Sequence, residues 1–389
     1  TIGGIVEFMR KLLDDNLKNI TISTTLVQFG NALVTVFIPL LLLQSGLSLT
    51  EVCLYFVVYA VFKLAINYPA MLITNRWGAK ISLMLSNVFQ AIYLILLVAV
   101  VNGDLRFVWL VAAFTSLCNA FAWNAYHLHV SRVINNTRKG QDIATIESIG
   151  ILASSIAPAV AAVLATMFNH GAPLAMAVVI VLLANYWLKD IDSVGEGHKR
   201  VDNLKYSLQY APKRDIIANI FHNTHGIIGK EAWAIYLALT LASFQSIAAV
   251  TTIAALISAV FLIFVGMRND KKGTHKVLQE GAVATSATHL LRLIPASFIV
   301  ITVINIIWMF TFKYQKNPWT TTYYAHTRNK GINYILSMEI GCDISYVLTF
   351  GLIFAIVTML GAHAAFPILF IVGAVAAMGT TLITPAHKA

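Results

Sequence analysis

Charged side chains are scarce in this sequence. Asp, Glu, Lys and Arg together make up 11% of the 389 residues, whereas 58% of the residues are hydrophobic. A soluble chain carries about 25% charged residues, most of them on its surface. The sequence therefore lacks the polar surface of a water-soluble enzyme, and a lipid bilayer suits most of its surface better than water does.

Cysteine is also scarce, and its three occurrences, Cys53, Cys118 and Cys342, all lie inside apolar runs. This placement argues against a disulfide framework or a cysteine metal cluster. The sequence has no nucleotide-binding loop and no HExxH motif, so neither ATP coupling nor metalloenzyme chemistry is indicated. We expect no cofactor, no metal site and no enzymatic activity.

Long apolar runs, by contrast, are abundant. Windows of about 20 apolar residues predict an all-α membrane protein with twelve transmembrane helices. Charged residues interrupt the ninth and tenth predicted spans, and an alternative ends the tenth near Phe312 and leaves 313–332 as a cytoplasmic loop. The predicted spans are 21–43, 50–73, 81–101, 106–130, 142–168, 172–189, 216–240, 245–267, 277–296, 298–325, 333–360 and 364–385.

The polar segment 190–214 divides the predicted spans into two sets of six. We expect an N-terminal six-helix bundle over 1–189, a cytoplasmic linker over 190–214 and a C-terminal six-helix bundle over 215–389. Most of the 27 Lys and Arg residues, Lys313 and Lys316 among them, fall on one side of this topology. The positive-inside rule assigns that side, and both termini, to the cytoplasm. The net charge of +10 then reflects orientation and not nucleic-acid binding.

Two predicted cytoplasmic turns repeat each other at about half the chain length, one after the second span and one after the eighth. Each combines a basic residue with a glycine two positions later, preceded by Asn in the first turn and Asp in the second. Either turn taken alone can be a plain basic turn under the positive-inside rule. The residues concerned are Asn75, Arg76 and Gly78 in the first turn and Gly266, Asp270, Lys271 and Gly273 in the second.

On these residues the chain resembles the major facilitator superfamily, whose signature between spans two and three has the same Gly, Asp, basic and Gly spacing. The second turn keeps the acidic residue, whereas Asn75 carries no charge and should form a weaker latch. The resemblance implies two pseudo-symmetric six-helix bundles and transport of a small solute by alternating access, coupled to a proton or other ion gradient. Span five has Ala where exporters of this superfamily often have Gly, so uptake and export both remain open.

Ionisable residues inside predicted spans are costly in lipid and often functional. Lys63 and Asp343 both lie about 18 Å from the cytoplasmic ends of their spans, which the resemblance brings face to face. We expect Lys63 to pair with Asp343 or Glu339 in one access state and to separate in the other. A static pair and a snorkelling lysine are the alternatives. Glu147 is a candidate proton carrier or, alternatively, an interfacial carboxylate.

Spans one, four, seven and ten hold the candidate substrate contacts. The resemblance implies that spans one and seven line a central cavity, and aromatic and His side chains of spans four and ten can stack on an organic solute. Alternatively, those aromatics form the inner interfacial belt, and His222 and His225 lie in a wet loop. The predicted contacts are Gln28, Asn31, Trp123, Tyr126, His127, His222, Asn223, His225, Trp319 and Tyr323.

The predicted function is therefore secondary transport by a monomeric, multi-pass plasma-membrane protein. Its expected partners are the lipid bilayer and a small-molecule or ion substrate, with no nucleic acid. Three alternatives remain at this stage: a metal-ion carrier of iron type, suggested by the His content, a non-transporting sensor, and a membrane-embedded enzyme.

Overall fold

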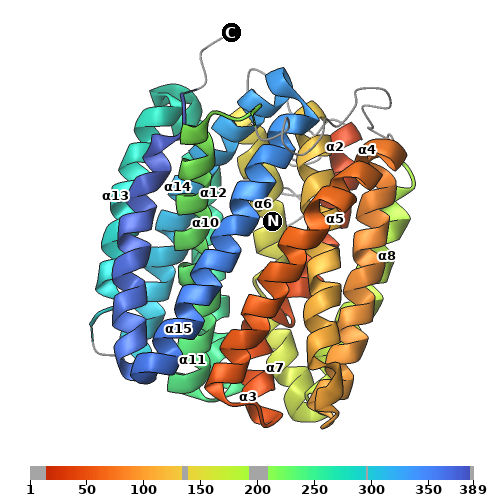
Figure 1. Cartoon of the computed structure of the whole chain (residues 1–389), viewed down its shortest axis with the longest axis vertical. Coiled ribbons are helices and arrows are strands. Elements are labelled where there is room, and N and C mark those ends of the chain that lie inside the picture. The colour runs from red at the N-terminus through yellow and green to blue at the C-terminus, as the bar shows by residue number, and fades with distance from the viewer. Residues whose placement is uncertain (1–14, 134–138, 192–208, 295–296, 386–389) are drawn as a thin grey trace.

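The structure, a computed structural model, describes residues 15–133, 139–191, 209–294 and 297–385. The described residues form helices and connecting turns and contain no strand. The helices pack side by side along the long axis of the molecule (Figure 1). This arrangement is expected in lipid, because helices satisfy their backbone hydrogen bonds internally. We call α2 to α8 the first half and α10 to η4 the second half.

The first half begins with a broken helix and continues through a very long one. A capping box starts α4: Ser48 N donates to Glu51 Oε2 (2.7 Å), and Glu51 N donates to Ser48 Oγ (3.3 Å). Helix α7 begins with Pro158 in its first turn, which breaks it from α6. The elements are α2 Asp15–Ala32, η1 Thr35–Phe37, α3 Ile38–Gln44, α4 Leu49–Val101, η2 Leu105–Phe107, α5 Val108–Val133, α6 Lys139–Ser154, α7 Ala157–Met167 and α8 Gly171–Leu188.

The second half also begins with an interrupted helix, in which a π-helical turn, η3, separates α10 from α11. Like α4 in the first half, one of its helices is too long for one membrane crossing. The elements are α10 Lys213–Ile227, η3 Ile228–Ala232, α11 Trp233–Leu241, α12 Phe244–Lys272, α13 Thr274–Leu291, α14 Phe298–Lys330, α15 Ile332–Gly379 and η4 Thr380–Leu382.

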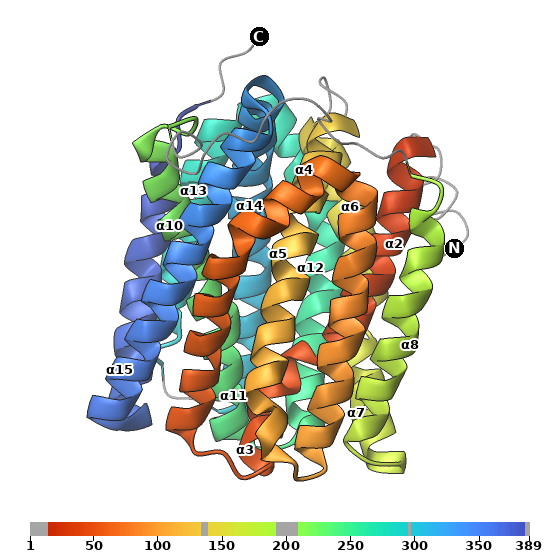
Figure 2. The same ribbon diagram turned by 45° about the vertical axis from the view of Figure 1, so that its right-hand side comes forward.

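The two longest helices each reverse direction at one glycine. Gly78 in α4 has φ 86° and Gly361 in α15 has φ 71°, a region that residues with a Cβ rarely adopt. Figure 2 shows α4 rising from α3, bending over and returning beside α5. We call the end of the molecule that holds the Gly78 turn the near end, and the opposite end, which holds the Gly361 turn, the far end.

Seven helical segments among the described residues are long and apolar enough to cross a membrane. Two of them exceed 50 residues, and one crossing needs about 20. Predicted spans seven, eight and nine do not qualify. Helices α10 and α13 turn polar side chains such as Asn219, Thr285 and His289 into the protein interior, and span eight contains the shorter apolar helix Phe244–Ser258 among the described residues. The seven segments are Lys18–Gln44, Leu49–Val101, Leu105–Val133, Ile146–Met167, Gly171–Leu188, Phe298–Lys330 and Ile332–Leu382.

The helices lie close to the predicted spans, with one correction in the tenth. Helix α14 runs without interruption to Lys330, so the alternative that ends this span near Phe312 is wrong. The physical reason is that its polar residues, Gln315 and Asn317 among them, are buried against other helices and are not exposed in a loop. The central part of the predicted linker, 192–208, lies outside the described residues.

The two halves contact each other at both ends. At the far end aromatic rings pair across them: Phe37 stacks on Phe244 with centroids 4.3 Å apart, and Phe56 stacks on Phe350 at 5.1 Å. At the near end aliphatic side chains of α4 and α5 pack against the start of α15. Between these contacts there is space between the halves, and the candidate site lies there.

Candidate functional site

Three cavities lie between the halves, and Trp123 of α5 contributes to the wall of each. Cavity A, of about 300 Å³, is lined mainly by the first half and by α14. Cavity B, of about 150 Å³, is lined mainly by α10, α14 and α15. Cavity C, of about 560 Å³, is lined by both halves. The Trp123 side chain is 41% exposed because it projects into this shared space.

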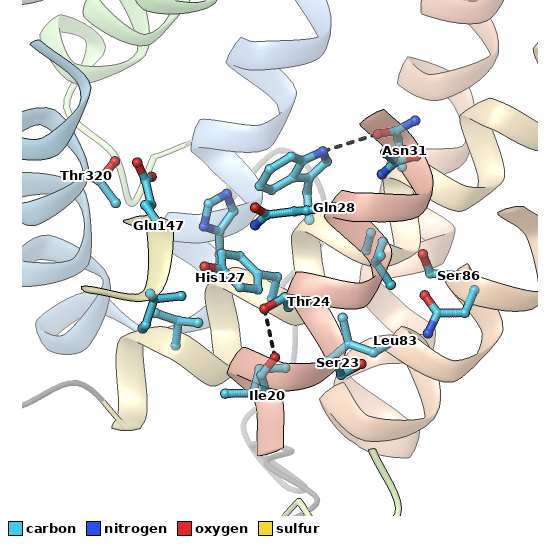
Figure 3. Close-up of a pocket in the computed structure, with 18 of the residues that line it drawn as sticks. Ile20, Ser23, Thr24, Gln28, Asn31, Leu83, Ser86, His127, Glu147 and Thr320 are labelled. Carbon is cyan, nitrogen blue, oxygen red and sulfur yellow. Dashed lines mark hydrogen bonds between the residues drawn. The ribbon is translucent and has the colours of Figure 1, made fainter. Parts of the chain in front are cut away.

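Cavity A contains the predicted contacts of the first half. Gln28, Asn31, His127 and Glu147 surround the same space from three helices (Figure 3). Asn31 is held in place because its Oδ1 accepts a hydrogen bond from Gln90 Nε2 at 2.6 Å. Polar side chains thus face an enclosed space in a chain that is otherwise apolar, as expected for a solute pathway.

Lys63 and Asp343 form an ion pair that joins α4 of the first half to α15 of the second. Lys63 is 1% exposed and Asp343 is 0% exposed, so the snorkelling alternative is wrong. Asn67 Nδ2 donates to the second carboxylate oxygen of Asp343, and Asn124 Nδ2 donates to Asn67 Oδ1 at 2.8 Å. The pair is therefore supported by a chain of hydrogen bonds. Whether it opens during function stays a prediction.

A second carboxylate, Glu147 of α6, contacts two lysines of α14 across the halves. Lys316 Nζ lies 2.7 Å from Glu147 Oε1, and Lys313 Nζ lies 3.4 Å from Oε2. All three side chains line cavity A. Glu147 thus faces a cavity between the halves, and the assignment of these two lysines to a cytoplasmic loop is wrong because both lie in α14. A role of Glu147 in proton transfer stays a prediction.

His127 and Glu339 make a third contact between the halves, with His127 Nε2 3.5 Å from Glu339 Oε1. His127 Nδ1 also hydrogen-bonds the Tyr324 hydroxyl at 3.0 Å, and its ring stacks on Trp123 with centroids 5.5 Å apart. Lys63, Glu147 and His127 thus each reach a residue of the other half. Each of these contacts has at least one member on the wall of cavity A or cavity B.

The predicted aromatic contacts of spans four and ten line cavities and do not form an interfacial belt. Tyr126 lines cavity A, whereas Trp319 and Tyr323 line cavity B and are only 4% and 5% exposed. The ring of Trp319 stacks on His222 with centroids 4.5 Å apart. Each half therefore presents one stacked Trp–His pair toward cavity B, the other being that of Trp123.

Only some of the contact residues predicted from span seven line a cavity. His222 and Asn223 line cavity B, and the wet-loop alternative is wrong because α10 already begins at Lys213. His225 lines none of the three cavities and is buried against His289, with ring centroids 6.1 Å apart. Its ring turns toward His289 of α13, whereas Gly226 and Ile227, the next residues along the chain, line cavity B.

Two wall residues outside the predicted contacts, Lys230 and Glu231, lie in the π-turn η3 and line both cavity B and cavity C. The ring of Trp308 packs against the turn so closely that a Cβ at Gly229 would lie 2.3 Å from it. π-Turns inside helices often mark functional sites. Two adjacent opposite charges before the apolar run of α11 were the sequence signal for this pair. Asn67 had a weaker signal, its place one helical turn after Lys63.

The two repeated turns have similar backbones. Gly78 has φ 86° and Gly273 has φ 88°, so both turns use the left-handed region that glycine permits. Arg76 and Lys271 are exposed at the near end. Gly266 and Asp270 lie in α12, but the surroundings of both are outside the described part of the structure. The latch predicted at Asp270 therefore stays a prediction.

The described residues contain no group of three or more His, Cys, Asp or Glu side chains arranged to hold a metal ion. The iron-carrier alternative therefore gains no support from the geometry of this site. The three cysteines are not bridged.

Solved transporter structures resemble the whole chain in fold. A single-residue variant of the Escherichia coli fucose:proton symporter FucP is 12% identical, with a TM-score of 0.67 over 94% of this chain and 97% of that one. FucP in the outward conformation is 13% identical, with a TM-score of 0.70 over 94% of this chain and 96% of that one. The human organic anion transporter MFSD10 is 9% identical, with a TM-score of 0.70 over 94% of this chain and 98% of that one.

Sequence comparison adds the family. No curated protein matches the chain. The family description "Major Facilitator Superfamily" matches residues 20–224, more than half of the chain, and this range includes most of the first half and most of α10. The chain thus belongs to the Major Facilitator Superfamily and is a transporter, not an enzyme.

Proposed function

We propose that the chain moves a small solute by alternating access through the space now divided into cavities A, B and C. Twelve spans would form two six-helix bundles, 1–189 and 215–389, joined by the linker 190–214, with both termini in the cytoplasm. The two helical segments of more than 50 residues support this count, because each reverses at a glycine and can cross the bilayer twice. The near end would then face the cytoplasm.

One observation carries this proposal: each charged contact described between the halves has at least one member on the wall of a cavity. Rigid-body movement of one half against the other would have to break Lys63–Asp343 or Glu147–Lys316 while it exposed the cavity. Contacts of this kind stabilise one arrangement and disappear in the other, which is how two-state transitions are built.

We further propose that a proton or another cation is the coupling ion. Protonation of Glu147 or Asp343 would remove the negative charge that holds the lysines of the other half. The resemblance in fold to a fucose:proton symporter is compatible with this coupling. The direction of transport would follow from the gradient and from which state binds the solute more tightly.

The test measures distances between the halves by double electron–electron resonance in a background without the native cysteines. Spin labels at Gln44 and Met359 report on the far end, and labels at Arg76 and Lys271 report on the near end, because all four side chains are exposed. We expect two populations at each end, and the substitution Lys63→Met should shift the two ends in opposite directions.

The matched control is a pair within the first half, Gln44 with Met167, whose distance should not change. A single population at each end that Lys63→Met leaves unchanged would contradict alternating access. That result would instead favour the sensor alternative, in which the fold is kept without transport.

A further inference from the structure

Lys230 and Glu231 differ from the other charged residues on the cavity walls. Lys63, Glu147, Lys313 and Lys316 each have an oppositely charged partner within 4 Å. Neither Lys230 nor Glu231 forms a salt bridge among the described residues. Both line cavity B and cavity C.

The position of this pair in the helix explains why the two side chains do not form a salt bridge with each other. Side chains at adjacent positions of a helix do not face each other. Lys230 is exposed into the cavities, and its ammonium lies 4.8 Å from the centre of the Phe312 ring. Glu231 Oε2 is buried and has no hydrogen-bond partner. An unmatched carboxylate oxygen in a dry site is costly unless a donor arrives from outside the protein.

We propose that cavities B and C bind a zwitterion, a small organic solute that carries an ammonium and a carboxylate. Its carboxylate would pair with Lys230 and its ammonium with Glu231. A solute with only a negative charge would satisfy Lys230 but leave the Glu231 oxygen unmatched, and a solute with only a positive charge would do the reverse. This inference names the substrate class of the proposed transporter and rests on that function.

The walls around the pair indicate the rest of the solute. Trp123, Phe312 and Tyr346 line both cavities beside the two charges. Aromatic faces of this kind favour an apolar or aromatic body, which stacks on them and excludes water from the charges. The zwitterion is therefore expected to resemble an apolar or aromatic amino acid in its chemistry and not a sugar.

The experiment compares three probes that share one body and differ only in charge: phenylalanine, phenylalaninamide and 3-phenylpropionate. A second set built on leucine, leucinamide and 4-methylpentanoate repeats the comparison with an aliphatic body. Thermal stabilisation of the purified full-length chain in detergent gives the apparent affinity of each probe. In at least one set the zwitterion should bind about tenfold or more tightly than both single-charge analogues, because each loses one charge-assisted contact.

Two variants test which residue pairs with which charge of the solute. Lys230→Met should make the amino acid and its amide bind equally, because the carboxylate then has no partner. Glu231→Gln should make the amino acid and the deaminated acid bind equally. The matched controls are Lys272→Met and Glu280→Gln, a partly exposed pair outside the three cavities. They should keep the preference for the zwitterion.

Equal or stronger binding of a single-charge analogue in both sets overturns the proposal, as does the absence of stabilisation by all six probes. A preference for the zwitterion that survives both Lys230→Met and Glu231→Gln would mean that the zwitterion binds at another site. This result would also overturn the proposal. The comparison of probes on the unmodified chain needs no variant to fold. Opposite distance changes at the two ends in the spin-label experiment would still support alternating access, even if the zwitterion proposal were wrong.

Discussion

The two carboxylates that bridge the halves, Asp343 and Glu147, are held in opposite ways. Asp343 is 0% exposed and is satisfied by one lysine and one asparagine amide. Glu147 contacts two lysines, and its side chain and that of Lys316 remain 12% and 27% exposed toward cavity A. The first site is dry, with one cation for one anion, whereas the second is partly wet and has an excess of positive charge.

The difference indicates which contact is costly to break and which tolerates the loss of one partner. Breaking a dry ion pair leaves an uncompensated buried charge and is strongly unfavourable. A partly hydrated cluster loses less, because water replaces a lost partner and one lysine can substitute for the other. We therefore expect Lys63–Asp343 to set the stability of the present arrangement and Glu147 to tune it.

The largest effect should come from removing one partner of the dry pair. Lys63→Met is expected to lower the free energy of unfolding by about 3–5 kcal/mol, because Asp343 stays buried without its cation. The double variant Lys63→Met with Asp343→Asn should recover most of that loss. Denaturant unfolding in detergent micelles measures both. A loss below about 1 kcal/mol in the single variant would show that the pair is hydrated after all.

The next effect tests the amides that support the dry pair. Asn124→Ala removes the donor to Asn67 Oδ1 and should cost about 1–3 kcal/mol, because that oxygen then stays buried and unpaired. The same unfolding measurement applies, with the more exposed Asn119→Ala as the control on the same helix. Equal costs for the two variants would mean that the amide chain does not support Asp343.

Glu147→Gln should have a smaller effect on stability, of about 1 kcal/mol or less, because the two lysines are partly hydrated. Its effect on the spin-label distances should nevertheless be clear, since both contacts between α6 and α14 weaken. A stability loss as large as that of Lys63→Met would remove the distinction between the two sites.

Salt should give the smallest effect. Raising the ionic strength from about 0.1 to 1 M shortens the screening length from about 10 to 3 Å. The stability difference between the unmodified chain and Glu147→Gln should shrink by a few tenths of a kcal/mol, about the scale of a partly exposed ion pair. The corresponding difference for Lys63→Met should stay the same. Equal salt dependence of both would contradict the dry and wet assignment.

Much of the fold could be predicted from the sequence. Apolar runs predicted the helices, because length and composition are what a bilayer selects, and the major facilitator resemblance is confirmed by the match over residues 20–224. Residue depth predicted that Lys63 and Asp343 lie at the same height, and the structure places them in contact. Depth could do this because the rise of a helix is constant.

The rest of the site could not be predicted in this way, because it depends on which face of a helix points inward. Lys313 and Lys316 look like loop cations in a count of charges, but they face Glu147. His225 looks like its neighbour His222, yet it is turned away from the cavities. The role of Lys230 depends on η3, a local change of helical register that no periodicity shows.

The π-turn η3 also makes the chain sensitive to its own length at one point. A π-turn closes its hydrogen bonds over one residue more than an α-turn does, so it accommodates one extra residue in an otherwise regular helix. Removing a single residue from Ile228–Ala232 would turn this segment into a regular α-helix while α10 and α11 kept their relative orientation. His222 and Asn223 would stay at cavity B, but the local widening that carries Lys230 and Glu231 would be lost, and with it the place of the charged pair on the wall. One extra residue in the chain thus sets the position of this pair without disturbing either end of the helix.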